Sequence, residues 1–165
     1  MKEPVSAIRL TYCDDAATWI RIVFSEPSNM NALPDENRNM KWAESLIDKL
    51  KRNEIIAAAP AVGTAFAGLF WAEPMPSGAW ESHQFVMPRF RGWTAFRCAR
   101  AMVDLFFRLM PKVNHLVGFT PVTHRAALVS AVKAGFVACG QMPNYYSLDG
   151  HLTDCVMMVK ERDNG

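Results

Sequence analysis

A short basic turn constrains the fold of this chain more than any other feature of its sequence. The stretch Phe85–Ala95 reads as a strand that runs through Arg89, Arg91 and Gly92 into a long amphipathic helix. The first N–H groups of a helix lack intrahelical acceptors and carry partial positive charge, so they form an anion site. Gly92 lets the backbone approach a ligand closely, and the guanidinium groups suit phosphate. The alternative is an ordinary turn with Thr94 as N-cap and both arginines in solvent, and these residues alone leave it open.

Hydrophobic periodicity and turn residues predict the elements around this turn. Helices are expected at Ala16–Phe24 with Asp14 and Asp15 as N-caps, from near Asp35 to about Arg52, at Ala95–Met110 and at Thr123–Ala134. Strands are expected at Val5–Thr11, Ile55–Ala59, Gly63–Ala72, Trp80–Met87, His115–Phe119, Asn144–Leu148 and His151–Val159. The Pro- and Asn-rich segment Ser25–Pro34 separates the first two helices, and Asp149-Gly150 predicts a tight hairpin. Antiparallel strands followed by βαβ units predict an α/β fold with a mixed sheet.

Composition restricts the class of protein. The 165 residues suit a single domain, and a net charge of +2 does not favour nucleic acid or an anionic membrane as a partner. Met1–Pro4 leads into no export signal, and no apolar run is long enough to span a membrane. The four cysteines (Cys13, Cys98, Cys139 and Cys155) are scattered, and no Cys/His grouping indicates a metal site. We therefore expect a reduced, cytoplasmic protein without a metal.

The strand, the turn and the helix resemble motif A of the GNAT superfamily of N-acetyltransferases, whose pattern is Arg/Gln-x-x-Gly-x-Gly/Ala. Arg89, Gly92 and Thr94 occupy those places. The segment His124–Phe136 is similar to the Asn-x-x-Ala…Gly-Phe helix of the same family. The resemblance implies one acyl-CoA-binding domain over residues 1–165. It also implies a mixed, mostly antiparallel sheet of six to seven strands, flanked by about four helices and splayed between the fourth and fifth strands.

The same resemblance implies a binding site for acetyl-CoA. The pyrophosphate is expected on the main-chain N–H groups of the turn, and the pantetheine arm along the end of the preceding strand. The implied binding residues are Phe85, Val86, Met87, Arg89, Phe90, Arg91, Gly92, Trp93, Thr94, Ala95 and His124.

Two positions depart from the family pattern in ways that bear on catalysis. Thr94 replaces a small residue, and Ala131 stands where many members carry a tyrosine that protonates the leaving thiolate. The Gly118–Pro121 and Asp149-Gly150 stretches also resemble small phage-encoded GNAT-like proteins, some of which serve in head assembly. A phage origin would place this chain in the cytoplasm of a host cell.

Acyl transfer to an amine needs a base, an N–H donor for the oxyanion, and an acid for the thiolate. Glu81 and His83 are the candidate bases, since they lie on the strand beside the expected thioester. The alternative is a solvated Glu81 and a His83 that packs on an aromatic ring. Tyr146 is the candidate acid, although tyrosines in strands are usually packing residues.

Two functions follow from these patterns. The first is an N-acyltransferase that transfers acetyl from acetyl-CoA to a primary amine, carried by a small molecule or a protein, by direct attack in a ternary complex. Glu26 and Asp35, at the segment expected over the acceptor, agree with a cationic amine. The second is a non-catalytic binding or assembly protein. A homodimer or another protein partner is compatible with either function.

Overall fold

A mixed eight-stranded sheet runs through the computed structural model, which describes residues 4–11 and 14–163. The strands are β1 (Val5–Leu10), β2 (Ile56–Val62), β3 (Ala65–Phe66), β4 (Gly68–Pro74), β5 (Trp80–Val86), β6 (His115–Pro121), β7 (Val137–Leu148) and β8 (His151–Glu161). They are ordered β1-β2-β4-β5-β6-β8-β7, with β3 against β2. Each neighbouring pair is antiparallel except β5 and β6. The predicted mixed, mostly antiparallel sheet is confirmed.

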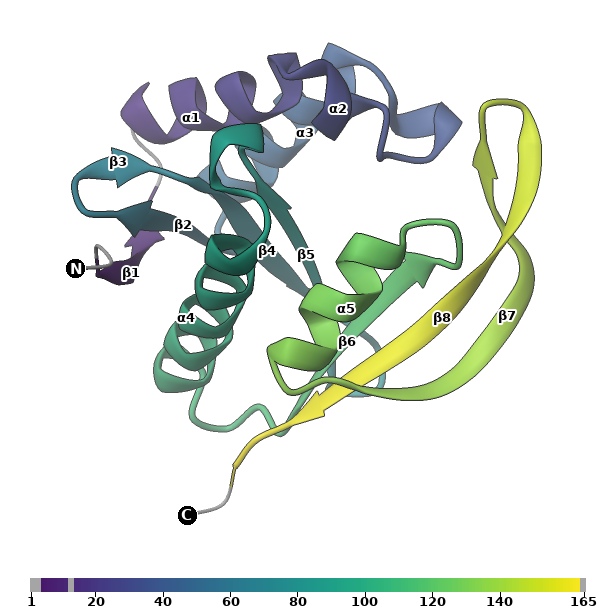
Figure 1. Cartoon of the computed structure of the whole chain (residues 1–165). Helices are drawn as coiled ribbons and strands as arrows, with labels where there is room; N and C mark the ends of the chain where they lie inside the picture. Colours follow the sequence, from purple (N-terminus) through teal and green to yellow (C-terminus); the bar gives the residue numbers. More distant parts are fainter. Residues whose placement is uncertain (1–3, 12–13, 164–165) are drawn as a thin grey trace.

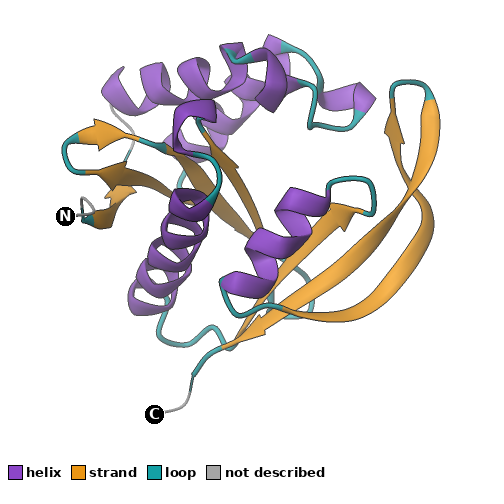
Figure 2. Ribbon diagram, in the orientation of Figure 1, coloured by secondary structure: helices purple, strands orange, loops and turns teal. Residues whose placement is uncertain are grey.

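Helices cover both faces of the sheet (Figures 1 and 2). They are α1 (Asp14–Ser25), α2 (Pro27–Met30), α3 (Met40–Lys51), α4 (Trp93–Leu109) and α5 (Arg125–Lys133), with 3₁₀ turns η1 (Asp35–Asn37) and η2 (Pro88–Phe90). Helices α1 and α3 pack on one face through Phe24, Leu46 and Trp71, and α4 packs on the other through Phe70 and Phe106. Alternation along each strand sends neighbouring side chains to these two separate cores.

The amphipathic helix after the basic turn forms as predicted. Helix α4 buries Cys98, Met102 and Phe106, which recur at helical spacing, and ends just before Pro111. Helix α5 is followed by Gly135 at φ 95°, a backbone conformation that favours glycine.

The structure has more elements than the six to seven strands and about four helices that the resemblance implies. The predicted strand Gly63–Ala72 divides into β3 and β4, because Ala67 N–H donates to Pro60 O and closes a small hairpin. Helix α2 forms inside the segment predicted to be irregular. There, the Glu26 side chain accepts from Ser28 N–H, and Pro27 sits at the first helical position.

Two predicted boundaries are wrong. The second long helix begins at Met40 rather than near Asp35, since Asn39 is its N-cap and accepts from Trp42 N–H. Strand β7 begins at Val137, well before Asn144. Register shifts at two places in β7 disrupt the alternation by which a strand is recognised.

Helix α1 begins at Asp14, so Asp15 lies inside the helix rather than at its N-cap. Cys13 and the Asp14 side chain lie outside what the structure describes.

Arg162 closes the far end of α4. Its guanidinium donates to the carbonyl oxygens of Phe107 (2.9 Å), Met110 (2.5 Å) and Val113 (2.9 and 3.1 Å), and it lies over the Phe107 ring. The last carbonyl groups of a helix have no intrahelical donors, so a cation there satisfies them and complements the helix dipole.

Replacing Arg162 by Met should lower the free energy of unfolding by about 2 kcal/mol, because these carbonyl groups lose a charged donor. Urea unfolding followed by circular dichroism measures the change. Arg108→Met removes an exposed arginine from the same last turn and should change stability by less than about 0.5 kcal/mol. Equal stability of the two variants would contradict the capping role.

Candidate active site

Strands β5 and β6 pair only at their beginnings. Trp80 lies opposite Leu116 and Glu81 opposite Val117, and beyond these pairs the two strands separate (Figure 1). The rest of β6 continues in register with β8. The Ser82 hydroxyl donates to Val117 O at 3.2 Å, at the point where the strands part. The predicted splay between the fourth and fifth strands is confirmed. These two strands are β5 and β6 in the structure, because β3 is an additional strand.

The parted edge of β5 exposes a backbone donor. Met87 N–H donates to Ala67 O at 2.9 Å, on the β4 side. Because N–H groups alternate between the two sides of a strand, that of Val86 points toward β6. The Arg91 Nε–H reaches Val86 O at 3.4 Å from the same side. Among the predicted residues Phe85, Val86 and Met87, Val86 therefore has the N–H that faces the separation.

The basic turn has an open backbone at Gly92. This residue has φ 80° and ψ −139° and is the N-cap of α4. A Cβ built there would meet no atom within 4 Å. Ala95 N–H donates to Gly92 O, whereas the N–H groups of Gly92 and Thr94 have no acceptor among the described residues. Thr94 lies in the first turn of α4 and is not the N-cap that the alternative interpretation required.

The two arginines of the turn have protein partners. The Arg91 Nη2 donates to Ser28 Oγ at 2.7 Å and to Asn29 Oδ1 at 2.9 Å, which ties the turn to α2. Its Nη1 has no partner among the described residues. Arg89 lies over the Phe90 ring and reaches Phe66 O at 3.5 Å. Both side chains flank the open backbone rather than fill it.

The remaining predicted binding residues lie on α4 and α5. Trp93 is 59% exposed and packs edge-on against Phe96, and Ala95 lies within the first turn of α4. His124 is the N-cap of α5. Because β5 and β6 are parallel and each runs into a helix, the N-termini of α4 and α5 lie at the same end of the sheet. Burial, and then the charge of Arg38, lower the pKa of His124.

Glu81 and His83 face the α1/α3 side and touch one another. The distance between His83 Nε2 and Glu81 Oε1 is 3.3 Å, and His83 stacks on Trp71 with ring centroids 4.7 Å apart. Glu73 lies 3.8 Å from the same nitrogen and is paired with Lys49 at 2.5 Å. His83 therefore packs on an aromatic ring, as the alternative interpretation expected, and it also lies next to the Glu81 carboxylate.

Burial acts on these two groups in opposite directions. It lowers the pKa of His83 to about 4, and, with the charge of Glu73, it raises the pKa of Glu81 from its ordinary value. Burial therefore makes His83 a weaker base and Glu81 a stronger one. A neutral His83 can donate a hydrogen bond to the Glu81 carboxylate.

Tyr146 reaches β6 from β7. Its hydroxyl donates to Phe119 O on β6 at 3.4 Å. Burial raises the pKa of Tyr146, and the charges of Tyr145 and Glu81 add to this effect. The phenol is therefore protonated at neutral pH and lies within electrostatic reach of Glu81. Ala131, where the family resemblance implies a tyrosine, is partly buried and packs against the core on the α4 side of the sheet.

Several solved structures are similar to this chain over most of its length. A spermidine N-acetyltransferase from Vibrio cholerae, with CoA and spermine, has a TM-score of 0.78 at 14% identity over 94% of this chain and 95% of that one. A ribosomal-protein-alanine N-acetyltransferase from Brucella melitensis has a TM-score of 0.73 at 14% identity, over 94% and 99%. A microcin self-immunity acetyltransferase, with acetyl-CoA and AMP, has a TM-score of 0.75 at 11% identity, over 95% and 93%.

This chain has the GNAT fold. No family model and no curated protein matches its sequence. Within the described ranges, no helix of this GNAT-fold chain is both long and apolar enough to cross a membrane.

Sequence reasoning missed several neighbours of the site. Lys49 comes from α3 and Glu73 from β4, and neither belongs to a recognisable motif. The antiparallel register of β4 and β5, which sets Glu73 opposite Glu81 and Trp71 opposite His83, was the one available signal. This register can be derived from the sequence only when the exact residues of the turn between β4 and β5 are known.

The pKa of His83 can be measured directly. Its imidazole resonance in an NMR titration should have a midpoint near 4, and a His83→Gln variant assigns the signal. The unfolded histidine titrates near 6.5, so the unfolded chain binds more protons between pH 4 and 6.5. Stability should therefore fall as the pH is lowered through this window, and less so in the variant. A midpoint near 6.5 would contradict the burial of His83.

Proposed function

We propose that this protein is an N-acetyltransferase that passes the acetyl group of acetyl-CoA to a primary amine by direct attack in a ternary complex. One observation carries the proposal: the open glycine turn at the start of α4 adjoins the end of β5, where that strand has parted from β6. An anion site next to an unpaired strand edge suits a ligand that joins a pyrophosphate to an amide-containing arm. The likeness to acetyltransferases that bind CoA or acetyl-CoA supports it.

The turn and the strand edge fit the parts of CoA. The N–H groups of Gly92 and Thr94 would receive the pyrophosphate, with Arg89 and the Nη1 of Arg91 beside it. The edge of β5 from Ser82 to Val86 would accept the pantetheine arm, as an added strand does. His124, at the same end of the sheet, would line the other side.

Glu81 is the proposed base. An amine acceptor arrives as an ammonium and must lose a proton before its nitrogen forms the new bond to the acetyl carbon. Glu81 would accept that proton, directly or through one water, with the His83 imidazole 3.3 Å from its carboxylate. Lys49 pairs with Glu73 and partly offsets the effect of the Glu73 charge on the pKa of Glu81.

Two further groups serve the acetyl carbon. The N–H of Val86 would donate to the carbonyl oxygen as negative charge develops on it, which lowers the barrier. As the C–S bond breaks, Tyr146 would give its phenolic proton to the leaving thiolate. Tyr146, on strand β7, would thus take the role of the tyrosine that the family resemblance implies on the helix at position 131, where this chain has alanine. The raised pKa of Tyr146 keeps the phenol protonated at neutral pH.

The acceptor belongs to the broad class of primary amines, and we propose a cationic one. Glu26 and Asp35 do not serve it directly, since Glu26 accepts from Ser28 and Asp35 from the β7–β8 turn. The negative charges proposed to attract the acceptor are instead those of Glu81 and the exposed Glu36, which both act electrostatically on Tyr146. The free cysteines Cys98, Cys139 and Cys155 support a cytoplasmic location.

A non-catalytic assembly protein is the second candidate. Exposed apolar side chains on α5, β7 and β8 favour a protein partner; they are Val129, Val132, Val137, Tyr145 and Leu152. This surface is compatible with an enzyme as well, so the response to acetyl-CoA separates the two functions.

Acetyl-CoA at about 100 times its Kd should stabilise the protein by about 2.7 kcal/mol, which raises Tm by about 5–10 °C. Gly92→Asp should abolish this shift, because a carboxylate would occupy the anion site. Gly78→Asp is the matched control, since Gly78 also has φ 80° and open space at its Cβ but lies in the β4–β5 turn. Differential scanning fluorimetry compares them. A retained shift in Gly92→Asp, or none in the native protein, would exclude the proposed site.

Glu81→Gln and Tyr146→Phe should each lower kcat for thiol release by about 100-fold, because each removes a proton-transfer group. The acetyl-CoA thermal shift should persist in both variants, which separates chemistry from binding. Tyr145→Phe alters the neighbouring, 46% exposed tyrosine and should keep nearly native turnover. Native kcat in both Glu81→Gln and Tyr146→Phe, measured over a panel of amines, would rule out these roles.

A further inference from the structure

The tip of the β7–β8 hairpin extends beyond the sheet. Strand β6 pairs with β8 only from Cys155 to Glu161, and a single bond from Val122 N–H to Asp154 O continues this contact. Strand β8 from His151 to Asp154, and the part of β7 opposite it, are therefore paired only with each other. Figure 1 shows this tip beside the segment that joins α2 to α3. An overhanging hairpin needs another anchor to hold its side chains in place.

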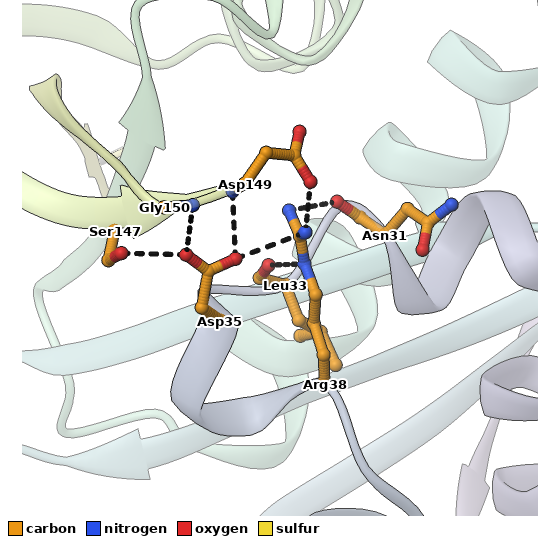
Figure 3. Close-up of polar contacts among 7 residues, drawn as sticks. All are labelled: Asn31, Leu33, Asp35, Arg38, Ser147, Asp149 and Gly150. Carbon is orange, nitrogen blue, oxygen red and sulfur yellow. Dashed lines mark hydrogen bonds and ion pairs between the residues drawn. The ribbon is translucent and has the colours of Figure 1, made fainter.

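Asp35 provides that anchor (Figure 3). Its carboxylate accepts from Ser147 Oγ at 2.6 Å and from the N–H groups of Asp149 at 2.8 Å and Gly150 at 2.9 Å. Asp149 and Gly150 have φ of 53° and 76°, so their N–H groups converge on one point. The hairpin tip is thus a small anion site, and η1 supplies the anion.

Arg38 completes the same cluster from the other end of η1 (Figure 3). Its side chain is only 16% exposed and pairs with the carboxylates of Asp149 and, at 3.1 Å, of Asp35. It also donates to Leu33 O and Asn31 O, each at 2.7 Å. One guanidinium therefore fixes the α2–η1 loop and the hairpin tip together. We call Asp35, Arg38, Ser147, Asp149 and Gly150 the clasp.

The clasp adjoins the proposed acid. Tyr146 directly precedes Ser147, so the hairpin is held on one side by Ser147 against η1 and on the other by Tyr146 against Phe119 O. Glu36, next to Asp35, acts electrostatically on Tyr146. Losing the clasp would release the contacts that hold the hairpin against η1 next to Tyr146.

We propose that Asp35 and Arg38 are positioning residues for the transfer reaction, which hold the overhanging hairpin so that Tyr146 faces the leaving sulfur. This inference rests on the proposed acetyltransferase function. It assigns the two residues no contact with either substrate. Their effect should appear in kcat, while acetyl-CoA binding, which uses the α4 end of β5, stays intact.

The test compares Asp35→Asn with the native protein and with Glu44→Gln. The first change keeps the size of the side chain but turns one acceptor of the clasp into a donor. The second removes a carboxylate that forms an equally direct pair with Arg21, on exposed surface of α3 away from the site. Amide hydrogen exchange at Asp149 and Gly150 reports on the clasp without any substrate.

In Asp35→Asn, exchange at Asp149 and Gly150 should accelerate more than tenfold and kcat should fall at least tenfold. KM for acetyl-CoA and the thermal shift should be unchanged, and Glu44→Gln should match the native protein. Asp35→Glu, which keeps the charge, should recover part of kcat. Accelerated exchange with native kcat would overturn the positioning role, and unaltered exchange would overturn the clasp itself. If the native protein released no thiol, the transfer function would fall and this role with it. The exchange data would still report separately on the hairpin anchor.

Discussion

The separation of β5 from β6 is the constraint on which the rest of this structure depends. Two parallel strands that start side by side, at Trp80 and Leu116, normally continue to pair. Here the Ser82 hydroxyl takes the carbonyl of Val117, and β6 pairs with β8 on its other edge. Residues Ser82 to Val86 therefore keep an unpaired edge at the centre of the sheet, where a ligand can supply the missing partner.

This separation also brings the functional groups together. Each of the two strands leads into a helix, so the N-termini of α4 and α5 converge beyond the open edge. Where the strands meet, Glu81 faces the α1/α3 side, and farther along β6 the Tyr146 hydroxyl reaches Phe119 O from the β7–β8 hairpin. The open turn at Gly92 follows the end of β5, and Glu81 lies at the other end of the unpaired edge.

Local physics made much of the fold predictable. The α4 stripe, the Asp149-Gly150 turn and the glycine after α5 depend on periodicity and backbone conformation, which are written in neighbouring residues. Strand β7 was only partly predictable, because Pro143 and two register shifts hide its alternation. Asp35 was predicted near the start of the second long helix, but it begins η1 and α3 begins at Met40. The Asp35 carboxylate is used by donors more than 100 residues away, and no local pattern reports such a contact.

The site shows the same division between local and long-range information. Glu81, His83 and the basic turn were predicted from the expected strand, the motif spacing and the family resemblance. The residues that surround His83 were not predicted. Trp71, Glu73 and Lys49 come near it only through tertiary packing. Arg91 is the clearest case. Its charge and position indicated a phosphate ligand, yet Ser28 and Asn29 hold one edge of its guanidinium. Only the folded chain shows that this arginine also ties α2 to the turn.

The central claim is that CoA occupies the open turn and the edge of β5 together. An amide NMR titration with CoA tests it most directly, since each backbone N–H reports its own hydrogen bond. The account predicts large, saturable shifts at Gly92, Thr94 and Val86, with little change at Met87, whose N–H is already bonded to Ala67. Shifts confined to other parts of the sheet, with Val86 and Gly92 unmoved at saturation, would contradict it.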